Sequence, residues 1–590
     1  MRPDIAALLH DIFGFPAFRG VQAQVVERIM AGRPTLAIMP TGAGKSLCYQ
    51  LPAVALEGCC VVISPLIALM HDQLRAAQAV GIRAASLTSV DADWRETQDR
   101  LRDGVLDLLY VAPERASTEG FRSLLRTAKV ALFAIDEAHC VSEWGHDFRP
   151  DYRLLRPLLD EFPDVPRLAL TATADAHTRA DVLVQLGIPA DGMIIAGFDR
   201  PNIRYAVHPR DGLTRQLADL VARNPGPGIV YAQTRAATEK IAEGLARTGR
   251  PVGIYHAGLD PRVRAANQAA FIASEDSVMV ATIAFGMGID KPDVRFVAHA
   301  GLPKSIEGYY QESGRAGRDG EPAQAHLFWG AEDFARARMR IMELDPARQQ
   351  GERARIAALG ALVETATCRR AILLRHFGED PPALCGNCDN CLTPPASVDA
   401  TETARKYLSA VYRTGQSFGA GHIEAVLSGG VTERIRDRGH DRISVYGIVA
   451  GEETALLRPV SRALLVRDAL ETTEHGGLML GPAARPILRG EEEVRILVPP
   501  RRERVKRSAR NGSGVNPVGD PLFDALRACR RELAQEAGVP PYVIFHDSTL
   551  REMAEAKPSS IHALATVSGV GQKKLDAYGD AFLAAIRPYL

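Results

Sequence analysis

The sequence predicts an α/β protein built on two parallel-sheet lobes, and three observations favour this fold class. Short apolar runs alternate with longer segments of helical spacing over residues 1–344, which is typical of βαβ units. The alternation pauses at AGFDRPNIRY, residues 196–205, and then resumes. The chain of 590 residues is also long enough for several domains. We therefore expect one lobe over residues 1–200 and a second over residues 201–344.

The expected strands are apolar runs joined by helical segments. In the first lobe they are TLAIMP (35–40), CCVVISPL (59–66), LDLLYVAP (106–113), VALFAIDEA (130–138) and RLALTATA (167–174). In the second lobe they are GIVYAQTR (228–235), PVGIYHAGL (251–259), VMVATIAF (278–285) and VRFVAHAG (294–301). Because helical crossovers separate successive runs, we expect the strands to pair in parallel.

Four smaller segments follow the two lobes. Residues 345–397 combine charged helical sequence with a cysteine cluster, and residues 398–500 contain short helices that end in alternating strands, as in a winged helix. Residues 501–518 lose apolar periodicity and gain Gly, Ser, Asn and Pro, which predicts a flexible linker. This linker is basic at its start. Residues 519–590 form a last, small helical unit.

Composition excludes several classes of protein. Apolar residues make up 46% of the chain and charged residues 24%, which is ordinary for a folded protein. Basic and acidic side chains number 71 each, so any nucleic-acid site must be a local patch. No apolar run reaches the roughly 18 residues of a membrane span, and the N-terminus does not fit a secretory signal. We expect a cytoplasmic protein without membrane association.

The run MPTGAGKS, residues 39–46, follows an expected strand and opens a helical stretch. Gly42 and Gly44 let backbone amides turn toward phosphate groups. Lys45 can reach the β and γ oxygens, and the Ser46 hydroxyl can hold Mg²⁺. Met39 stands where the full pattern has its first glycine, so a Gly-rich turn between strand and helix is the alternative interpretation.

A carboxylate pair supports the phosphate site. IDEAH, residues 135–139, ends a second expected strand. Asp136 can bind the metal through a water, and Glu137 can orient or deprotonate the attacking water. Without the phosphate loop upstream, such a pair would indicate only a solvated start to a loop.

From these motifs onward the chain resembles the RecQ-type helicases of superfamily 2. The motifs that carry the resemblance occur in order through essentially the whole chain. They are FGFPAFRGVQ (13–22), SPLIALMHDQ (64–73), APER (112–115), LTATA (170–174), YAQTR (231–235), YHAGL (255–259), TIAFGMGIDKPDVRFVAH (282–299) and QESGRAGRDG (311–320). The resemblance implies RecA-like lobes that bind ATP between them.

The resemblance also implies further nucleotide-site residues. Phe15 is expected to stack on the adenine with Arg19 beside it, and Gln22 to read the edge of the base. Thr41 and Asp290 belong to the expected nucleotide site. Arg315 and Arg318 are the candidate arginine fingers, which supply positive charge to the transferring phosphoryl group from the second lobe.

Two segments are candidates for DNA contact. CVSEWGHDFRPDY, residues 140–152, resembles the aromatic-rich loop of the family, with Trp144, Phe148 and Arg149 as the binding residues. Rings in a loop suit stacking on unpaired bases, although the same rings could anchor a buried loop. TERIRDRGHDRISVYG, residues 432–447, resembles the recognition helix of a winged helix. Its Arg434 and Arg436 are expected to contact duplex DNA, although a solvated helix face has a similar charge pattern.

Four cysteines predict a structural zinc site. Cys385, Cys388 and Cys391 follow one another at two-residue gaps, and Cys368 lies 16 intervening residues before them. Four thiolates can complete a tetrahedral shell with no open position for catalysis. An iron–sulfur cluster and unligated thiols are the alternatives, but the fourth Cys and following Pro of the bacterial ferredoxin run are missing.

The expected function is that of an ATP-dependent DNA helicase acting in DNA repair or recombination, with ATP, Mg²⁺ and Zn²⁺ as cofactors. The 3′ to 5′ polarity is implied by the resemblance alone. The expected partners are single-stranded and forked duplex DNA, a single-strand-binding protein and other repair proteins at the nucleoid. An RNA-directed helicase is one alternative, and a binding and annealing protein with a regulatory ATPase is another. The terminal unit resembles the small domain shared by RecQ helicases and RNase D, and it could equally contact protein.

Overall fold

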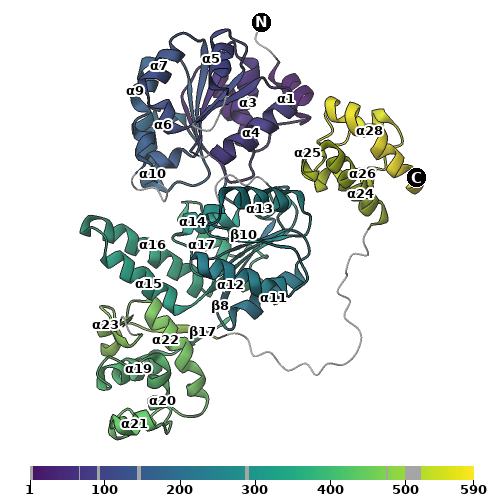
Figure 1. Ribbon diagram of the computed structural model, residues 1–590. Helices are drawn as coiled ribbons and strands as arrows, with labels where there is room; N and C mark the ends of the chain where they lie inside the picture. The colour runs from purple at the N-terminus through teal and green to yellow at the C-terminus, as the bar shows by residue number, and fades with distance from the viewer. Residues whose placement is uncertain are drawn as a thin grey trace.

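The computed structural model describes residues 4–65, 67–88, 93–142, 148–285, 291–473, 476–498 and 520–590. Two α/β lobes are followed by a pair of long helices, a winged helix and a separate helical unit at the C-terminus (Figure 1). This arrangement confirms the predicted fold class. Within these described ranges, no helix is long and apolar enough to cross a bilayer.

The first lobe is organised around a parallel sheet, which has seven strands among the residues described. In sheet order the strands are β3 (Ala84–Leu87), β4 (Leu108–Val111), β2 (Cys59–Ile63), β5 (Val130–Ile135), β6 (Arg167–Thr171), β1 (Thr35–Ile38) and β7 (Met193–Ile195). The surrounding α-helices are α1 (Ile5–Phe13), α2 (Gln22–Met30), α3 (Leu47–Ala55), α4 (Ile67–Ala79), α5 (Trp94–Arg102), α6 (Pro113–Ala116), α7 (Glu119–Leu125), α8 (Pro150–Arg153), α9 (Arg156–Glu161) and α10 (Ala176–Leu186).

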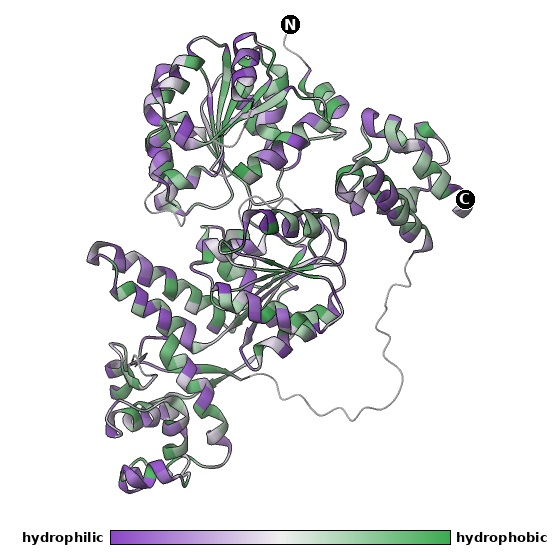
Figure 2. Cartoon of the chain, viewed as in Figure 1, coloured by the Kyte–Doolittle hydropathy of each residue, from purple (hydrophilic) through white to green (hydrophobic). Residues whose placement is uncertain are grey.

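The second lobe repeats this plan with a parallel sheet whose described part has six strands. In sheet order they are β10 (Val252–Tyr255), β11 (Val278–Ala281), β9 (Gly228–Tyr231), β12 (Phe296–His299), β13 (Ala323–Trp329) and β8 (Ile203–Pro209). Its helices are α11 (Leu213–Arg223), α12 (Arg235–Ala246), α13 (Pro261–Ala273) and α14 (Ile306–Ser313). Three of these six strands, β9, β11 and β12, are fully buried. The apolar residues concentrate in the sheets of both lobes (Figure 2).

The segments after the second lobe pack as smaller units. The helical region that leads to the cysteines consists of α15 (Ala331–Met342), α16 (Pro346–Glu364), α17 (Arg369–His376) and α18 (Asp389–Leu392). The winged helix comprises β14 (Ala396–Asp399), α19 (Thr401–Arg413), α20 (Ala420–Leu427), α21 (Glu433–Asp437), α22 (Leu457–Val466), β15 (Leu470–Thr472), β16 (Leu478–Leu480), α23 (Ala484–Arg489) and β17 (Arg495–Val498). The terminal unit consists of α24 (Pro521–Ala537), α25 (Pro541–Ile544), α26 (Asp547–Ala556), α27 (Ile561–Ala565) and α28 (Gln572–Ile586).

All nine apolar runs predicted as strands form strands, and the sequence pattern missed four others in the two large sheets. β3 reads AASL and β7 has three residues, so neither carries a strong β signal. β8 and β13 contain polar or charged residues and still pair in parallel over seven residues. Their register is set by partners far away in the sequence, which local periodicity cannot show.

Candidate active site

Three neighbouring strands place the main motifs of the first lobe at one sheet edge. β5, β6 and β1 are adjacent and parallel, so their carboxyl ends meet. The phosphate loop follows β1, the IDEAH carboxylates follow β5, and the LTATA segment ends β6. Ligands of open α/β sheets bind at this carboxyl edge. The fold therefore brings together motifs as far apart in the sequence as residues 39–46 and 170–174.

The phosphate loop has the conformation that its glycines predict. Gly42 and Gly44 have φ angles of 87° and 73°, in the left-handed region that favours glycine. The Lys45 ammonium donates to the Met39 carbonyl at 3.3 Å, which holds the side chain over the loop. Ser46 occupies the N-cap position of α3 without a capping hydrogen bond from its side chain, at a helix end where the geometry favours anions.

The segment expected to recognise adenine, residues 13–22, packs against this loop. The Arg19 guanidinium lies 5.7 Å from the centre of the Phe15 ring. Gln22 is buried, and its side-chain amide donates to the carbonyls of Ala43 at 2.9 Å and Gly44 at 3.3 Å. Gln22 therefore supports the phosphate loop directly, a contact that the motif alone does not reveal. The expected contact of Gln22 with the edge of the adenine base stays a prediction.

The two carboxylates after β5 lie in different environments. Burial, followed by repulsion from Glu137, raises the pKa of Asp136 to about 7. Glu137 has a left-handed φ of 48°. Its Oε2 atom is buried without a hydrogen-bond partner among the described residues and lies 3.4 Å from Nδ1 of His139. A buried carboxylate oxygen that lacks a partner is suited to hold a water molecule.

Sequence reasoning did not single out His139. Its ring is buried, and Nδ1 lies 2.9 Å from the Thr171 hydroxyl at the end of β6. That hydroxyl also donates to the Thr173 carbonyl at 3.1 Å. The IDEAH and LTATA segments are therefore joined by a direct hydrogen bond between His139 and Thr171.

The second lobe brings its arginines to the phosphate loop. The segment after α14 carries Arg315 and Arg318, and a Cβ atom placed on Gly42 would lie 3.4 Å from Cγ of Arg318. Arg315 is buried within the second lobe, whereas Arg318 is half-buried at the boundary. Both positive charges act on the phenol of Tyr231, whose pKa burial nevertheless raises to about 12.

The cysteine cluster has the donor set of a zinc site. The four Sγ atoms of Cys368, Cys385, Cys388 and Cys391 lie within 4.8 Å of one another. Backbone amides of Asn387 and Cys388 donate to Cys385 Sγ at 3.4 and 3.3 Å. Such hydrogen bonds stabilise thiolates, and four thiolates favour zinc. No further group of three or more potential metal ligands is found within the described residues.

Comparisons with known proteins agree with this geometry. The first lobe matches the DEAD/DEAH box helicase family over residues 19–182, and the second matches the helicase conserved C-terminal domain over residues 212–320. The remaining matches are RecQ zinc-binding over residues 331–392, the RQC domain over residues 394–505 and the HRDC domain over residues 520–586.

The ATP-dependent DNA helicase RecQ of Haemophilus influenzae is 42% identical, in a match that covers 100% of this chain and 96% of that protein. The chain belongs to the RecQ family. The Bacillus subtilis protein of the same name is 37% identical to this RecQ-family chain, across 99% of this chain and 98% of its own. The resemblance predicted from the motifs is thereby confirmed, and the predicted cofactors ATP, Mg²⁺ and Zn²⁺ agree with these matches.

Two predicted residues of this RecQ chain, Trp144 and Asp290, lie outside the described residues. The neighbours of Trp144 are described. Phe148 is half-buried, with the Arg153 guanidinium 5.5 Å from its ring centre. Arg149 is half-buried and donates to the Pro65 carbonyl at 2.9 Å. Arg149 therefore holds the SPLIALMHDQ segment, which the sequence did not predict.

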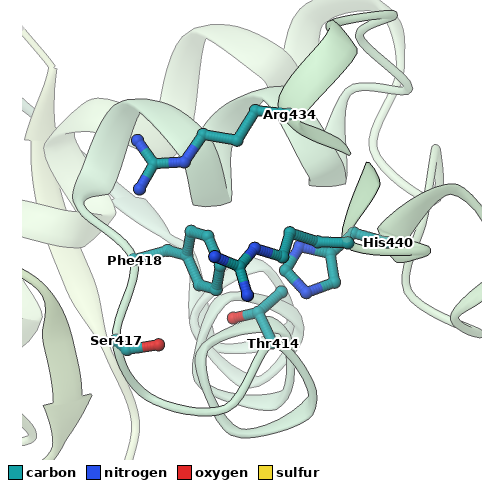
Figure 3. A pocket seen from close by; sticks show the side chains of 6 residues that line it. Thr414, Ser417, Phe418, Arg434 and His440 are labelled. Carbon is teal, nitrogen blue, oxygen red and sulfur yellow. The ribbon is translucent and has the colours of Figure 1, made fainter. Parts of the chain in front are cut away.

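The RecQ winged helix presents an open polar pocket beside α21. Arg434 lies above the Phe418 ring, with its guanidinium 5.2 Å from the ring centre (Figure 3). His440 closes another side, and its Nδ1 lies 2.8 Å from Nε2 of His422. The lining residues are Thr414, Ser417, Phe418, Arg434, Arg438 and His440. Arg438 lines this pocket and Arg436 does not, although the sequence analysis selected Arg436.

Proposed function

We propose that this RecQ-family chain hydrolyses ATP between its two lobes and uses hydrolysis to move 3′ to 5′ along single-stranded DNA. It separates forked duplexes ahead of it, in DNA repair or recombination. The observation that carries the proposal is the contact of Arg318 with Gly42. This contact supports a phosphate site to which each lobe contributes a part. Closure of the cleft between the lobes would then complete the site.

In the first lobe, the amides of Gly42 and Gly44 and the ammonium of Lys45 bind the phosphates. Ser46 and Asp136 have the hard oxygen donors that suit Mg²⁺, and the bound ion neutralises charge on the phosphate oxygens. Glu137 orients the attacking water through its unpartnered Oε2 and accepts a proton from it. Thr41 and Asp290 complete the site, and Phe15, Arg19 and Gln22 bind the adenine.

In the second lobe, we assign the arginine finger to Arg318. Its side chain reaches the phosphate loop at Gly42, whereas Arg315 is buried inside its own lobe. An arginine finger can be worth ~10³-fold or more in turnover. Arg318→Ala should therefore cost more in turnover than in ATP binding, and Arg315→Ala should also destabilise the second lobe.

DNA contacts divide between the motor and the winged helix. Trp144, Phe148 and Arg149 contact single strands, and Arg434 and Arg436 contact the duplex, with Arg438 as an added contact. We assign residues 1–200 and 201–344 to the motor lobes, 345–397 to the zinc subdomain and 398–500 to the winged helix. Residues 501–518 are the basic linker, and residues 519–590 are the C-terminal domain.

The DNA substrate suggests where the protein works. We infer a cytoplasmic protein associated with the nucleoid, with a single-strand-binding protein and other repair proteins as partners. Displaced single strands are the shared substrate of such proteins, which supports this inference.

The test compares ATPase rates with single-stranded DNA, with single-stranded RNA and without polymer. We expect strong stimulation by DNA and little by RNA. Equal stimulation by both polymers would favour an RNA-directed helicase. A rate that no polymer changes, together with duplex annealing, would favour a binding protein with a regulatory ATPase.

A further inference from the structure

The connector between the two lobes carries an arginine that contacts both of them. Arg200 lies in the stretch AGFDRPNIRY, where the strand and helix alternation of the sequence pauses. Its Nη1 donates to the Thr41 carbonyl of the phosphate loop at 2.7 Å and to the Gly314 carbonyl at 3.0 Å. Its Nη2 donates to the carbonyls of Ala316 at 3.0 Å and Gly317 at 2.9 Å. One guanidinium thus joins the phosphate loop to the segment that holds Arg315 and Arg318.

The acceptors explain why an arginine stands here. All four are backbone carbonyls, so the contacts fix the path of the main chain and not the side chains that act on ATP. A planar guanidinium offers five N–H donors in a rigid fork. A lysine ammonium has three donors at a single point and cannot reach four carbonyls spread over two lobes.

Neighbouring side chains fix the connector on both sides of Arg200. Asn202 donates through Nδ2 to the carbonyls of Gly317 at 2.8 Å and Glu321 at 2.9 Å. Tyr310 donates from its hydroxyl to the Phe198 carbonyl at 2.6 Å. Arg370 donates to the Ile203 carbonyl at 2.7 Å. The connector is therefore attached to the second lobe, and the Thr41 contact is the one by which Arg200 reaches the first.

We propose that Arg200 is a positioning residue for ATP hydrolysis, which latches the phosphate loop to the arginine segment when the cleft closes. The inference rests on the proposed function, since it presumes hydrolysis at this boundary. Three of its four contacts lie in the second lobe, so opening of the cleft breaks only the bond to Thr41. Arg200 then remains in place to make that bond again in the next cycle.

The test uses the full-length chain with Arg200→Gln and Arg200→Lys, beside the control Arg204→Gln. Arg204 is an exposed arginine on the same stretch, and its side chain makes no hydrogen bond to the described residues. Three quantities are measured: the affinity for a fluorescent ADP analogue, kcat and KM of the DNA-stimulated ATPase, and the change in single-strand affinity caused by a non-hydrolysable ATP analogue. Thermal unfolding shows whether each variant is folded.

For Arg200→Gln we expect kcat to fall at least tenfold, with KM and the ADP-analogue affinity within about threefold of wild type. The effect of the ATP analogue on DNA affinity should disappear, because the lobes no longer communicate through the latch. Arg200→Lys should fall between wild type and Gln, and Arg204→Gln should match wild type. If Arg200→Gln does not fold, Arg200→Lys decides. A lower kcat with a reduced effect of the ATP analogue on DNA affinity, at unchanged KM and ADP-analogue affinity, would then support the proposal.

A kcat of Arg200→Gln within twofold of wild type would overturn the proposal. The proposal would also fail if this variant lost turnover while the ATP analogue still changed its affinity for single-stranded DNA. Failure of the proposed function is a separate result, because it would appear as a wild-type chain without DNA-stimulated hydrolysis.

Discussion

Asn387 lies between two of the clustered cysteines, and its side-chain amide donates to the carbonyl of Pro201 at 3.1 Å. Asp389, on the other side of Cys388, accepts a hydrogen bond from the backbone amide of Val207, on β8, at 2.9 Å. The cysteine loop therefore holds the start of the second lobe and the connector next to Arg200. Zinc bound by the four cysteines would fix this loop and, through these two contacts, support the start of the second lobe.

The first prediction concerns removal of one thiolate. Cys388→Ser should lower zinc content and the thermal unfolding temperature, because metal binding and folding are coupled at such sites. Stimulated ATPase should fall more than nucleotide affinity, since the connector loses its support while the phosphate loop does not. Metal analysis measures the zinc content, and differential scanning calorimetry measures the unfolding temperature.

Cys529→Ser is the matched control, because Cys529 is a half-buried cysteine in the terminal unit, away from the cluster. It should retain about one zinc per chain. Iron in the purified wild-type protein would overturn the zinc assignment.

Lys45→Ala should abolish unwinding while single-strand binding persists. In the proposed site the ammonium holds the phosphates, and none of the predicted DNA contacts depends on it. Phosphoryl-transfer groups of this kind are worth ~10³-fold or more in turnover. Displacement kinetics and fluorescence anisotropy separate the two effects, and unwinding within tenfold of wild type would contradict the assignment.

The winged-helix pocket predicts that Arg434 and Arg438 bind DNA phosphates. Each change to Ala should weaken duplex binding and reduce the slope of log K against log salt by about 0.9 for each phosphate that the variant no longer neutralises. Titrations at several salt concentrations measure both. Arg489→Ala, an exposed arginine on α23, is the control. An unchanged slope in both pocket variants would show that the pocket does not bind phosphate.

Ion pairs join the terminal unit to the second lobe, and the larger cluster is centred on Glu275. A further pair joins Arg551 to Glu321 at 3.2 Å. Glu275 lies 2.7 Å from Arg530, 2.8 Å from Arg531 and 3.2 Å from Arg527, all on α24. Burial raises the pKa of Glu275, but hydrogen bonds led by Arg531 outweigh it and hold the pKa below its ordinary value. A lowered pKa means that the contact is complete above the ordinary pKa and is weakened as the pH falls through the lowered value.

Glu275→Gln, which leaves the Arg551–Glu321 pair in place, should weaken the attachment of the terminal unit and increase the radius of gyration measured by small-angle scattering at neutral pH. Acidification should give wild type the same larger radius. Glu243→Gln, an exposed carboxylate on α12, should leave the radius unchanged. Equal radii for Glu275→Gln and wild type at neutral pH would show that this carboxylate does not hold the unit.

Local sequence was enough to predict the geometry of segments in which it follows from residue type and spacing. The phosphate loop, the carboxylates and the four cysteines needed only their own segments, because strand ends and cysteine spacing determine their geometry. Arg200 was not predicted, since its role depends on carbonyls of Thr41 and Gly317 that carry no sequence signal. Arg438 was passed over for Arg436 because charge alone does not show which face of a short helix borders the pocket.

The most direct test of the account is strand displacement from forked DNA with ATP, comparing a substrate with only a 3′ tail and one with only a 5′ tail. Glu137→Gln is measured in parallel, because it keeps the side-chain shape but cannot accept a proton. We predict that wild type displaces the strand of the 3′-tailed substrate in the presence of ATP and displaces little of the 5′-tailed substrate. Displacement of the 3′-tailed substrate by Glu137→Gln should be at least ~10³-fold slower. Displacement that needs no ATP, or that Glu137→Gln supports at the wild-type rate, would contradict the account.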